Sequence, residues 1–252
     1  MADVKNSKQE LVKLMKEFLR IAPDLYLPAI SIDPVVFSYH NGKLNVLVVR
    51  FAGSSGFGLP GGFVKKNEDI DAAALRILQE MTGINNIYLE QFYTSGKVSR
   101  YDKKVIRNLF IKRGLELPAN NWMEQRFVSV CYYALVDAEK VMLKSMPFIE
   151  AFKWMDVKKL PRLSYDHNDI IGKAVSRLQS DLDNKLVEFK LMDETFTMKD
   201  LQKLYEIVYQ RKMVRTNFQR RILNLGVLER LDKKYNGKSH KAPYLYRFAR
   251  AK

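Results

Sequence analysis

The last sixth of this chain is strongly basic, which limits what that segment can fold into and bind. The protein has 252 residues and a formal net charge of +15. Residues 211–252 contain 13 lysines and arginines against 2 acidic residues, so 11 of the 15 net charges lie there. Clustered charge of one sign is typical of a polyanionic partner. Because apolar residues recur regularly between these charges, we expect a folded basic module. A disordered arm or a merely solvated face is the alternative.

Two helices are expected around the start of this module. Thr197 followed by Asp200 is typical of a capping box, with apolar residues at helical spacing behind it. Thr216 followed by Gln219 repeats this helix-start signal, and Gly226 is a typical helix end. The segment between the two helices is short, so the pair predicts a helix-turn-helix.

A basic hairpin is expected after the second helix. Residues 227–231 and 244–248 have the composition of strands, and the turn-rich segment between them carries several lysines. Helix, turn, helix and basic hairpin in this order predict a winged helix-turn-helix domain. The alternative interpretation is an ordinary α+β subdomain with a charged surface.

The second helix is the expected reader of DNA. Its apolar residues share one face, which leaves polar side chains for the major groove. We expect base contacts from Asn217 and Arg220, and phosphate contacts from the cations near them and in the hairpin. The complete set of predicted DNA-binding residues is Lys212, Arg215, Thr216, Asn217, Arg220, Arg221, Asn224, Lys233, Lys234, Lys238, His240 and Lys241.

The first two-thirds of the chain predict a mixed α and β domain. With 47% hydrophobic residues, the protein can bury a sizeable core. Asn41-Gly42 predicts a tight hairpin turn, and Pro23 and Gly83 are expected to end helices. From apolar periodicity we expect strands over 29–39, 43–50, 87–93, 105–112, 126–136 and 152–155, a loop over 112–125, and helices over 7–22, 69–82 and 167–183.

Some classes of protein are excluded by composition. No apolar run approaches the roughly 20 residues that a bilayer span needs, and the first residues are polar. We therefore expect no membrane helix and no secretory signal, and a cytoplasmic location. Cys131 is the single cysteine and lies in an apolar stretch, which predicts a core thiol rather than a disulfide or a thiol metal site.

A glycine- and carboxylate-bearing motif covers residues 62–84. It follows the lead-in Leu59-Pro60-Gly61-Gly62 and resembles the Nudix box, in which a glycine, spaced glutamates, an arginine and a second glycine recur in fixed register. The positions in register with that box are Gly62, Glu68, Arg76, Leu78, Glu80, Gly83 and Ile84. The resemblance implies a Nudix-like α/β/α sandwich domain.

The catalytic part of this motif is incomplete. Nudix hydrolases cluster helix glutamates around Mg²⁺, a cation that requires oxygen ligands. Ile77 and Met81 stand where the box has two of its glutamates. Glu80 and Glu68 alone are a poor cation site, so we expect no metal, no cofactor, no catalytic residues and no enzymatic activity. Glu80 has either a structural role beside Arg76 or a role in ligand binding.

A degenerate Nudix domain joined to a winged helix resembles the NrtR-like transcriptional regulators. Residues 31–33, 91–94, 127–130, 163–167 and 196–248 and Trp154 are also similar to landmarks of that family. The expected organisation, α+β overall, is an N-terminal helix over 1–26, an effector-sensing domain over 27–162, a linker helix over 163–188 and a winged helix-turn-helix over 189–252. The resemblance implies a homodimer that represses metabolic genes and leaves its double-stranded operator when a small effector binds.

The effector is suggested by the branch of the family. Some members sense ADP-ribose and others sugars, and the chain is most similar to the arabinose-responsive branch, which implies carbohydrate metabolism and a pentose such as L-arabinose. The predicted effector-binding residues are Asp33, Arg50, Glu80, Tyr93, Lys97 and Arg100. Asp166, before His167, is expected to be a helix N-cap rather than catalytic. Alternatives are an ADP-ribose-responsive regulator of NAD metabolism, a nucleotide or RNA hydrolase, and an RNA-binding protein without a sensor.

Overall fold

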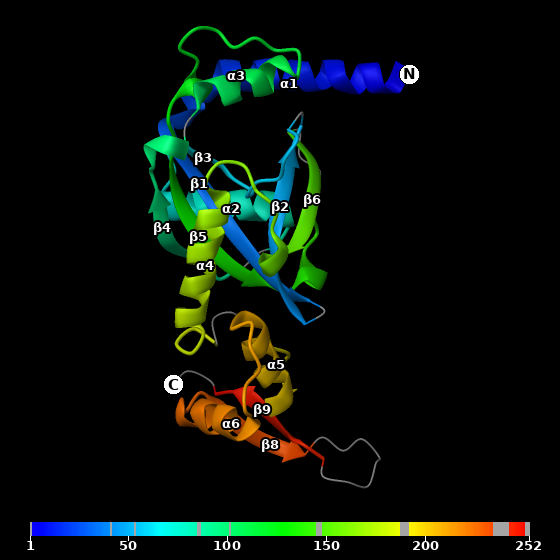
Figure 1. Ribbon diagram of the computed structural model, residues 1–252, viewed down its shortest axis with the longest axis vertical. Coiled ribbons are helices and arrows are strands. Elements are labelled where there is room, and N and C mark those ends of the chain that lie inside the picture. Colours follow the sequence, from blue (N-terminus) through cyan, green and yellow to red (C-terminus); the bar gives the residue numbers. More distant parts are fainter. Residues whose placement is uncertain are drawn as a thin grey trace.

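Two domains follow one another along the long axis of the molecule, with the N-terminal helix at the opposite end from the smaller domain (Figure 1). This computed structural model describes residues 2–40, 42–52, 54–84, 87–100, 102–144, 148–186, 192–233 and 242–249. Among these residues, no helix is both long and apolar enough to cross a membrane.

The larger domain is built on one mixed sheet, flanked by helices. Its helices are α1 (Ala2–Leu25), α2 (Ile70–Thr82), α3 (Lys103–Ile111) and α4 (His167–Asp181), with short 3-10 turns η1 (Val98–Arg100), η2 (Trp122–Glu124), η3 (Ala138–Lys140) and η4 (Val157–Lys159). Its strands are β1 (Tyr26–His40), β2 (Lys43–Phe51), β3 (Gly62–Lys65), β4 (Glu90–Ser95), β5 (Val128–Val136) and β6 (Ile149–Asp156).

The long strand β1 organises this sheet. The strand order is β4-β5-β1-β2-β6, and β3 pairs with the first half of β1 on the same edge as β2. β1 and β5 are parallel, with Ser31 opposite Ser129 and Asp33 opposite Cys131. The hairpin predicted at residues 41–42 is confirmed, because His40 pairs with Lys43 and Gly42 has a φ of 71°. Cys131 is fully buried, as expected of a core thiol.

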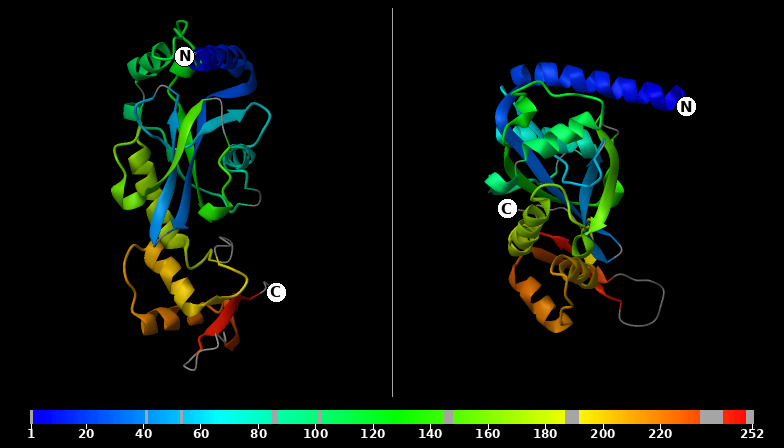
Figure 2. Two further views of the ribbon diagram at one scale, coloured as in Figure 1. Left: turned by 90° about the vertical axis from the view of Figure 1, so that its right-hand side faces the viewer. Right: turned by 45° about the horizontal axis from the view of Figure 1, so that its top comes forward.

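Helices cover both faces of the sheet, which makes an α/β/α sandwich (Figure 2, left). Alternate residues of β1 point to opposite faces. Ile32 packs with residues of α2, whereas Val35 and Phe37 pack with residues of α4. The predicted helix over 69–82 is confirmed as α2, and Gly83, with a φ of 69°, caps its end.

A third helical layer closes the end of the sandwich. Residues 105–112 were expected to be a strand, but α3 occupies this region. Ile106 and Phe110, one helical turn apart, are buried against Met15 of α1. The apolar run therefore serves a helix that packs on another helix, and the expectation of a strand is wrong. Pro23 does not end α1 either, since the helix continues to Leu25.

The smaller domain contains the predicted helix-turn-helix. Its elements are β7 (Phe196–Thr197), α5 (Met198–Val208), α6 (Arg215–Asn224), β8 (Leu228–Lys233) and β9 (Tyr244–Phe248), and the strands pair in the order β7-β9-β8. The Thr197–Asp200 capping box is confirmed. Residues 234–241, most of the predicted basic turn, lie outside the described residues.

The start of α6 differs from the expectation. Thr216 lies within the first turn, and the N-cap is Val214, which makes no side-chain capping bond. The position of the helix is set by the preceding turn instead. Glu206 of α5 accepts a hydrogen bond from the Met213 amide at 2.9 Å, and Gln202 donates to the Met213 carbonyl at 2.9 Å.

Candidate DNA-binding face and effector site

The outer face of α6 is polar and exposed. Phe218 and Ile222 are buried in the domain core, at 3% and 0% exposure, and therefore fix which side of the helix faces outwards. The exposed side chains include Thr216, Asn217, Arg220 and Asn224. Amide and guanidinium groups on a short exposed helix are the groups that read base edges in a major groove.

The other predicted DNA-binding cations lie near the start of α6 and in the hairpin that follows it. Lys212 lies exposed in the turn before α6 and Arg215 lies exposed at its start; Lys212 reaches Glu206 at 3.1 Å while 95% of its side chain is exposed. The Lys233 ammonium lies 5.4 Å from the centre of the Tyr244 ring, at the base of the hairpin. Lys234, Lys238, His240 and Lys241 lie outside the described residues.

Arg221 is placed differently from the other cations of α6. Its Nε and Nη2 atoms donate to Asp183 Oδ2 at 3.0 and 2.5 Å, and Nη2 also donates to the Tyr209 hydroxyl at 3.3 Å. Asp183 follows α4, so this arginine faces the larger domain.

Two of the predicted effector residues form a buried polar cluster beneath the start of α4. Arg100 Nη2 donates to Asp33 Oδ2 at 3.0 Å, and both side chains are about nine-tenths buried. Arg100 Nε lies 3.3 Å from Asp166 Oδ1, and the Ser95 hydroxyl donates to the same Asp166 carboxylate. Segments far apart in sequence therefore meet here.

His167 completes the cluster. Its Nδ1 accepts a hydrogen bond from the Leu59 amide at 2.8 Å, and its Nε2 lies 3.9 Å from Asp33 Oδ2. Burial lowers the pKa of His167 below its usual value, and the neighbouring Asp33 opposes this shift. The imidazole is therefore neutral near pH 7. A Cβ at Gly58 would lie 2.9 Å from His167 Nδ1, so a larger residue there would displace the ring.

Asp166 corrects one expectation. It occupies the N-cap position of α4, but its side chain makes no capping hydrogen bond because Arg100 and Ser95 hold it. Sequence reasoning missed Ser95 and His167 as members of the cluster. The adjacent Asp166-His167 pair was the signal that could have found His167, whereas nothing local distinguishes Ser95.

The other four predicted effector residues do not join this cluster. Lys97 pairs with Asp169 at 2.8 Å on the exposed side of α4. Tyr93 lies beneath Lys173, 4.7 Å from its ammonium. Arg50 lies 3.3 Å from Glu150, and Glu80 lies on α2, which covers the other face of the sheet. The structure thus brings together Asp33 and Arg100 but not the complete predicted set.

The helix of the Nudix-like box contributes apolar side chains to the core. Ile77 and Met81, which the sequence resemblance aligns with two box glutamates, are 2% and 3% exposed and pack in the core between α2 and the sheet. Ile77 covers Gly62, where a Cβ would meet it at 2.8 Å. Within the described ranges, no group of three or more His, Cys, Asp or Glu side chains could hold a metal ion.

Glu68 and Glu80 both contact Arg76. Arg76 Nη2 donates to Glu68 Oε1 at 2.5 Å and to the Phe63 carbonyl at 2.9 Å, and Arg76 Nη1 lies 3.4 Å from Glu80. The hydrogen bond from Arg76 holds the pKa of the Glu68 carboxyl below its usual range. Glu80 thus has a structural partner.

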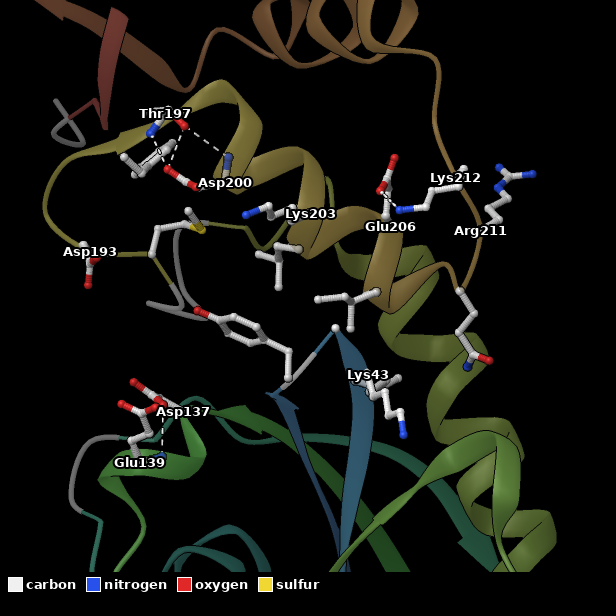
Figure 3. Close-up of a pocket in the computed structure, with 18 of the residues that line it drawn as sticks. Lys43, Asp137, Glu139, Asp193, Thr197, Asp200, Lys203, Glu206, Arg211 and Lys212 are labelled. Atoms are coloured by element: carbon white, nitrogen blue, oxygen red, sulfur yellow. Dashed lines mark hydrogen bonds and ion pairs between the residues drawn. The ribbon is translucent and has the colours of Figure 1, made fainter. Parts of the chain in front are cut away.

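A cavity of about 1010 Å³ lies between the two domains (Figure 3). Side chains of both charges line it, among them Asp137 and Glu139 of the larger domain and Lys203 of α5. The described residues that line it include none of the six predicted effector residues. The Asp33–Arg100 cluster and this cavity are therefore separate places.

Family models match both domains. The NUDIX domain matches residues 34–178, more than half of the chain, and the NrtR DNA-binding winged helix domain matches residues 188–248. The Nudix sandwich followed by a winged helix, predicted from the sequence, is confirmed.

Individual relatives agree with this assignment. The ADPR responsive transcriptional repressor NtrR of Acinetobacter baylyi is 30% identical over 230 residues, which cover 88% of this chain and 82% of the relative. The crystal structure of Shewanella oneidensis NrtR is 27% identical, with a TM-score of 0.63 over 88% of this chain and 94% of that one. The same protein complexed with a 27mer DNA is 25% identical, with a TM-score of 0.61 over the same shares. The chain therefore belongs to the NrtR family of Nudix proteins that carry a DNA-binding winged helix domain.

Proposed function

We propose that this protein is a transcriptional repressor that binds duplex DNA through the exposed face of α6. The observation that carries the proposal is the polar outer face of α6, with Asn217 and Arg220 exposed opposite a buried Phe218. The repressor function is that of the Acinetobacter relative, and the Shewanella relative has been crystallised with DNA. Phosphate contacts come from Lys212, Arg215 and the basic hairpin.

The effector proposed first is ADP-ribose. The Acinetobacter repressor is ADPR responsive, which favours this ligand over the pentose that the sequence resemblance suggested. Asp33 and Arg100 are the predicted effector residues that the fold joins, and their polar groups are of the kind that orients a bound ligand. Binding there would act on α4, because Asp166 and His167 belong to the same cluster. L-arabinose remains the alternative effector.

The protein is proposed to act as a homodimer without enzymatic activity. A two-fold dimer would place two recognition helices on successive major grooves of a pseudo-palindromic operator. The buried Ile77 and Met81 support a domain that binds its effector without hydrolysing it. Light scattering of the full chain, alone and with duplex DNA, tests the dimer.

The function is tested by selecting DNA with the full chain. A random duplex library is enriched on the protein, and the affinity of the recovered duplex is measured by fluorescence anisotropy with ADP-ribose or L-arabinose added. We expect a selected sequence that binds more tightly than its scrambled control and is released by ADP-ribose. With about 6 to 10 phosphate contacts, affinity falls by about 10³ to 10⁵ between 50 and 200 mM salt.

Three outcomes contradict parts of this proposal. Equal binding of selected and scrambled duplexes at every salt concentration removes the repressor function. Tighter binding to RNA of the same sequence supports the RNA-binding alternative. Mg²⁺-dependent turnover of ADP-ribose, lost in Glu80→Gln, supports a hydrolase.

A further inference from the structure

The proposed recognition helix, α6, is attached to the larger domain by one of its own arginines. Arg221 lies on the flank of α6 and pairs through two nitrogens with Asp183, just beyond the end of α4. The Arg221 side chain is 41% exposed and that of Asp183 is 23% exposed. The pair is thus partly shielded from solvent, and screening by salt acts on it less than on a fully exposed pair.

Aromatic rings hold the Arg221 guanidinium in this place. It lies 5.7 Å from the centre of the Tyr209 ring and 6.0 Å from that of Tyr205. Tyr205 is completely buried and packs edge-on against Phe218 of α6, with ring centres 5.1 Å apart. Burial, and then the nearby Asp183 carboxylate, raise the pKa of Tyr205. One arginine therefore connects the recognition helix, the core of the winged helix and the end of α4.

Further bonds reach the turn of the helix-turn-helix from two sides of the larger domain. From α4, the side-chain amide of Gln179 donates from Nε2 to the Val208 backbone carbonyl at 3.0 Å. The Tyr209 hydroxyl donates to the Gln179 backbone carbonyl at 2.8 Å. From η4, Lys158 Nζ donates to the Gln210 carbonyl at 3.2 Å. The end of α5 and the turn after it are thus bonded to two separate elements of the Nudix domain.

We propose that Arg221 is a positioning residue for DNA binding: with Asp183 and the bonds to residues 208–210, it forms an interdomain clasp. This clasp transmits the position of α4 to the recognition helix, and the inference rests on the proposed function. Because Arg221 borders the buried Phe218–Ile222 face and not the outward face of Arg220, it sets the angle of α6 without contacting phosphate.

The salt dependence of DNA binding separates positioning from phosphate contact. Each lost phosphate contact lowers the slope of log K against log salt by about 0.9. Affinity and slope are measured for the full chain on the selected duplex, for Arg221→Gln, Asp183→Asn and the double variant. Arg215→Gln is the matched control, because it removes an arginine from the exposed start of the same helix.

A clasp predicts one pattern of results. Both single variants weaken binding by a similar factor, about three- to tenfold, and the double variant binds no more weakly than either, since both remove one interaction. Their salt slopes equal that of the wild type, whereas Arg215→Gln lowers the slope by about 0.9. Thermal unfolding checks that each variant is folded. Gln179→Met, which removes a clasp bond without changing charge, gives the same test if Arg221→Gln does not fold.

A different pattern overturns the clasp. A slope lowered by about 0.9 in Arg221→Gln, together with unchanged or tighter binding of Asp183→Asn, identifies Arg221 as a phosphate contact that Asp183 holds away from DNA. Additive losses in the double variant also overturn it. If the wild type binds no duplex selectively, the proposed function itself fails, and the positioning role fails with it.

Discussion

Neighbouring arginines on α6 have different surroundings despite their identical chemistry. Arg220 and Arg221 are neighbours in sequence, yet a helix turns 100° per residue, so one points to solvent and the other towards Asp183. The sequence placed both among the DNA contacts. Apolar periodicity identifies the buried face of α6, but it does not show which residue of the larger domain lies beside Arg221.

Arg220→Ala is expected to reduce sequence discrimination. An arginine that reads a base edge contributes about 1–3 kcal/mol of discrimination, so the ratio of affinities for selected and scrambled duplexes should fall accordingly. Anisotropy titrations with both duplexes measure this ratio. Lys16→Ala, which removes an exposed cation from α1 at the opposite end of the molecule, is the control. An unchanged ratio in Arg220→Ala would exclude Arg220 from base recognition.

His167 predicts a dependence of stability on pH. Its pKa in the folded protein lies below the ordinary 6.5 because the ring is buried. As pH falls below about 6.5, the unfolded chain takes up a proton that the folded ring does not, and the free energy of unfolding decreases. Above that pH the imidazole is neutral in both the folded and the unfolded chain, so His167 causes no loss of stability.

Denaturant unfolding at pH 7.5, 6.5 and 5.5 measures this effect. In His167→Gln, whose amide oxygen can still accept from the Leu59 amide, the loss of stability between pH 6.5 and 5.5 should be smaller than in the wild type. The difference between the two proteins isolates His167 from the other histidines. Equal losses would mean that the buried ring titrates normally.

At the level of elements, local signals were the most reliable predictors. The hairpin at 41–42, α2 with Gly83 and the Thr197 capping box were all predicted, because each depends on residues within one turn or cap. The helix α3 and the start of α6 were not predicted, because they depend on contacts with other elements: α3 packs on α1, and Glu206 of α5 binds the turn before α6. The Asp33–Arg100 contact spans 67 residues, and only the sheet and η1 bring it together.

The helix α2 packs against the sheet through Ile77 and its neighbours. Ile77→Ala should lower the free energy of unfolding by about 2–5 kcal/mol, since it leaves a cavity among Ile32, Val64 and Met81. Glu80→Gln, half exposed on the same helix, should change it by no more than about 0.5 kcal/mol. Urea unfolding of both variants provides the comparison. A small loss in Ile77→Ala would indicate that this position is not part of the core.

Over the whole molecule, α4 runs from the polar cluster to the clasp. The helix extends from the sandwich towards the smaller domain (Figure 1). Its first residue, His167, lies beside Asp33, and Asp183 beyond its end pairs with Arg221. A helix is stiff over this length, so a displacement at one end is carried to the other. This continuity supports coupling between effector and DNA, which linkage requires to be reciprocal.

Reciprocity gives a prediction for the complete protein. The factor by which ADP-ribose weakens DNA binding should equal the factor by which DNA weakens ADP-ribose binding, typically about 5- to 150-fold. Calorimetry of ADP-ribose binding with and without the selected duplex, combined with anisotropy, measures both factors. In Asp183→Asn both factors should shrink together. Unequal factors in the wild type would show that an additional equilibrium, such as dimer dissociation, takes part.

The parallel pairing of β1 with β5 has a consequence for how the chain is made. Ser31 and Ser129 face each other but are 98 residues apart in sequence. At ribosomal rates of about 5–20 residues per second, roughly 5–20 s pass between the synthesis of β1 and that of β5. Throughout this interval an apolar strand edge is unpaired and open to aggregation. The Nudix domain should therefore depend on chaperones during synthesis, whereas the winged helix, whose strands all lie within residues 196–248, can assemble as soon as it is released.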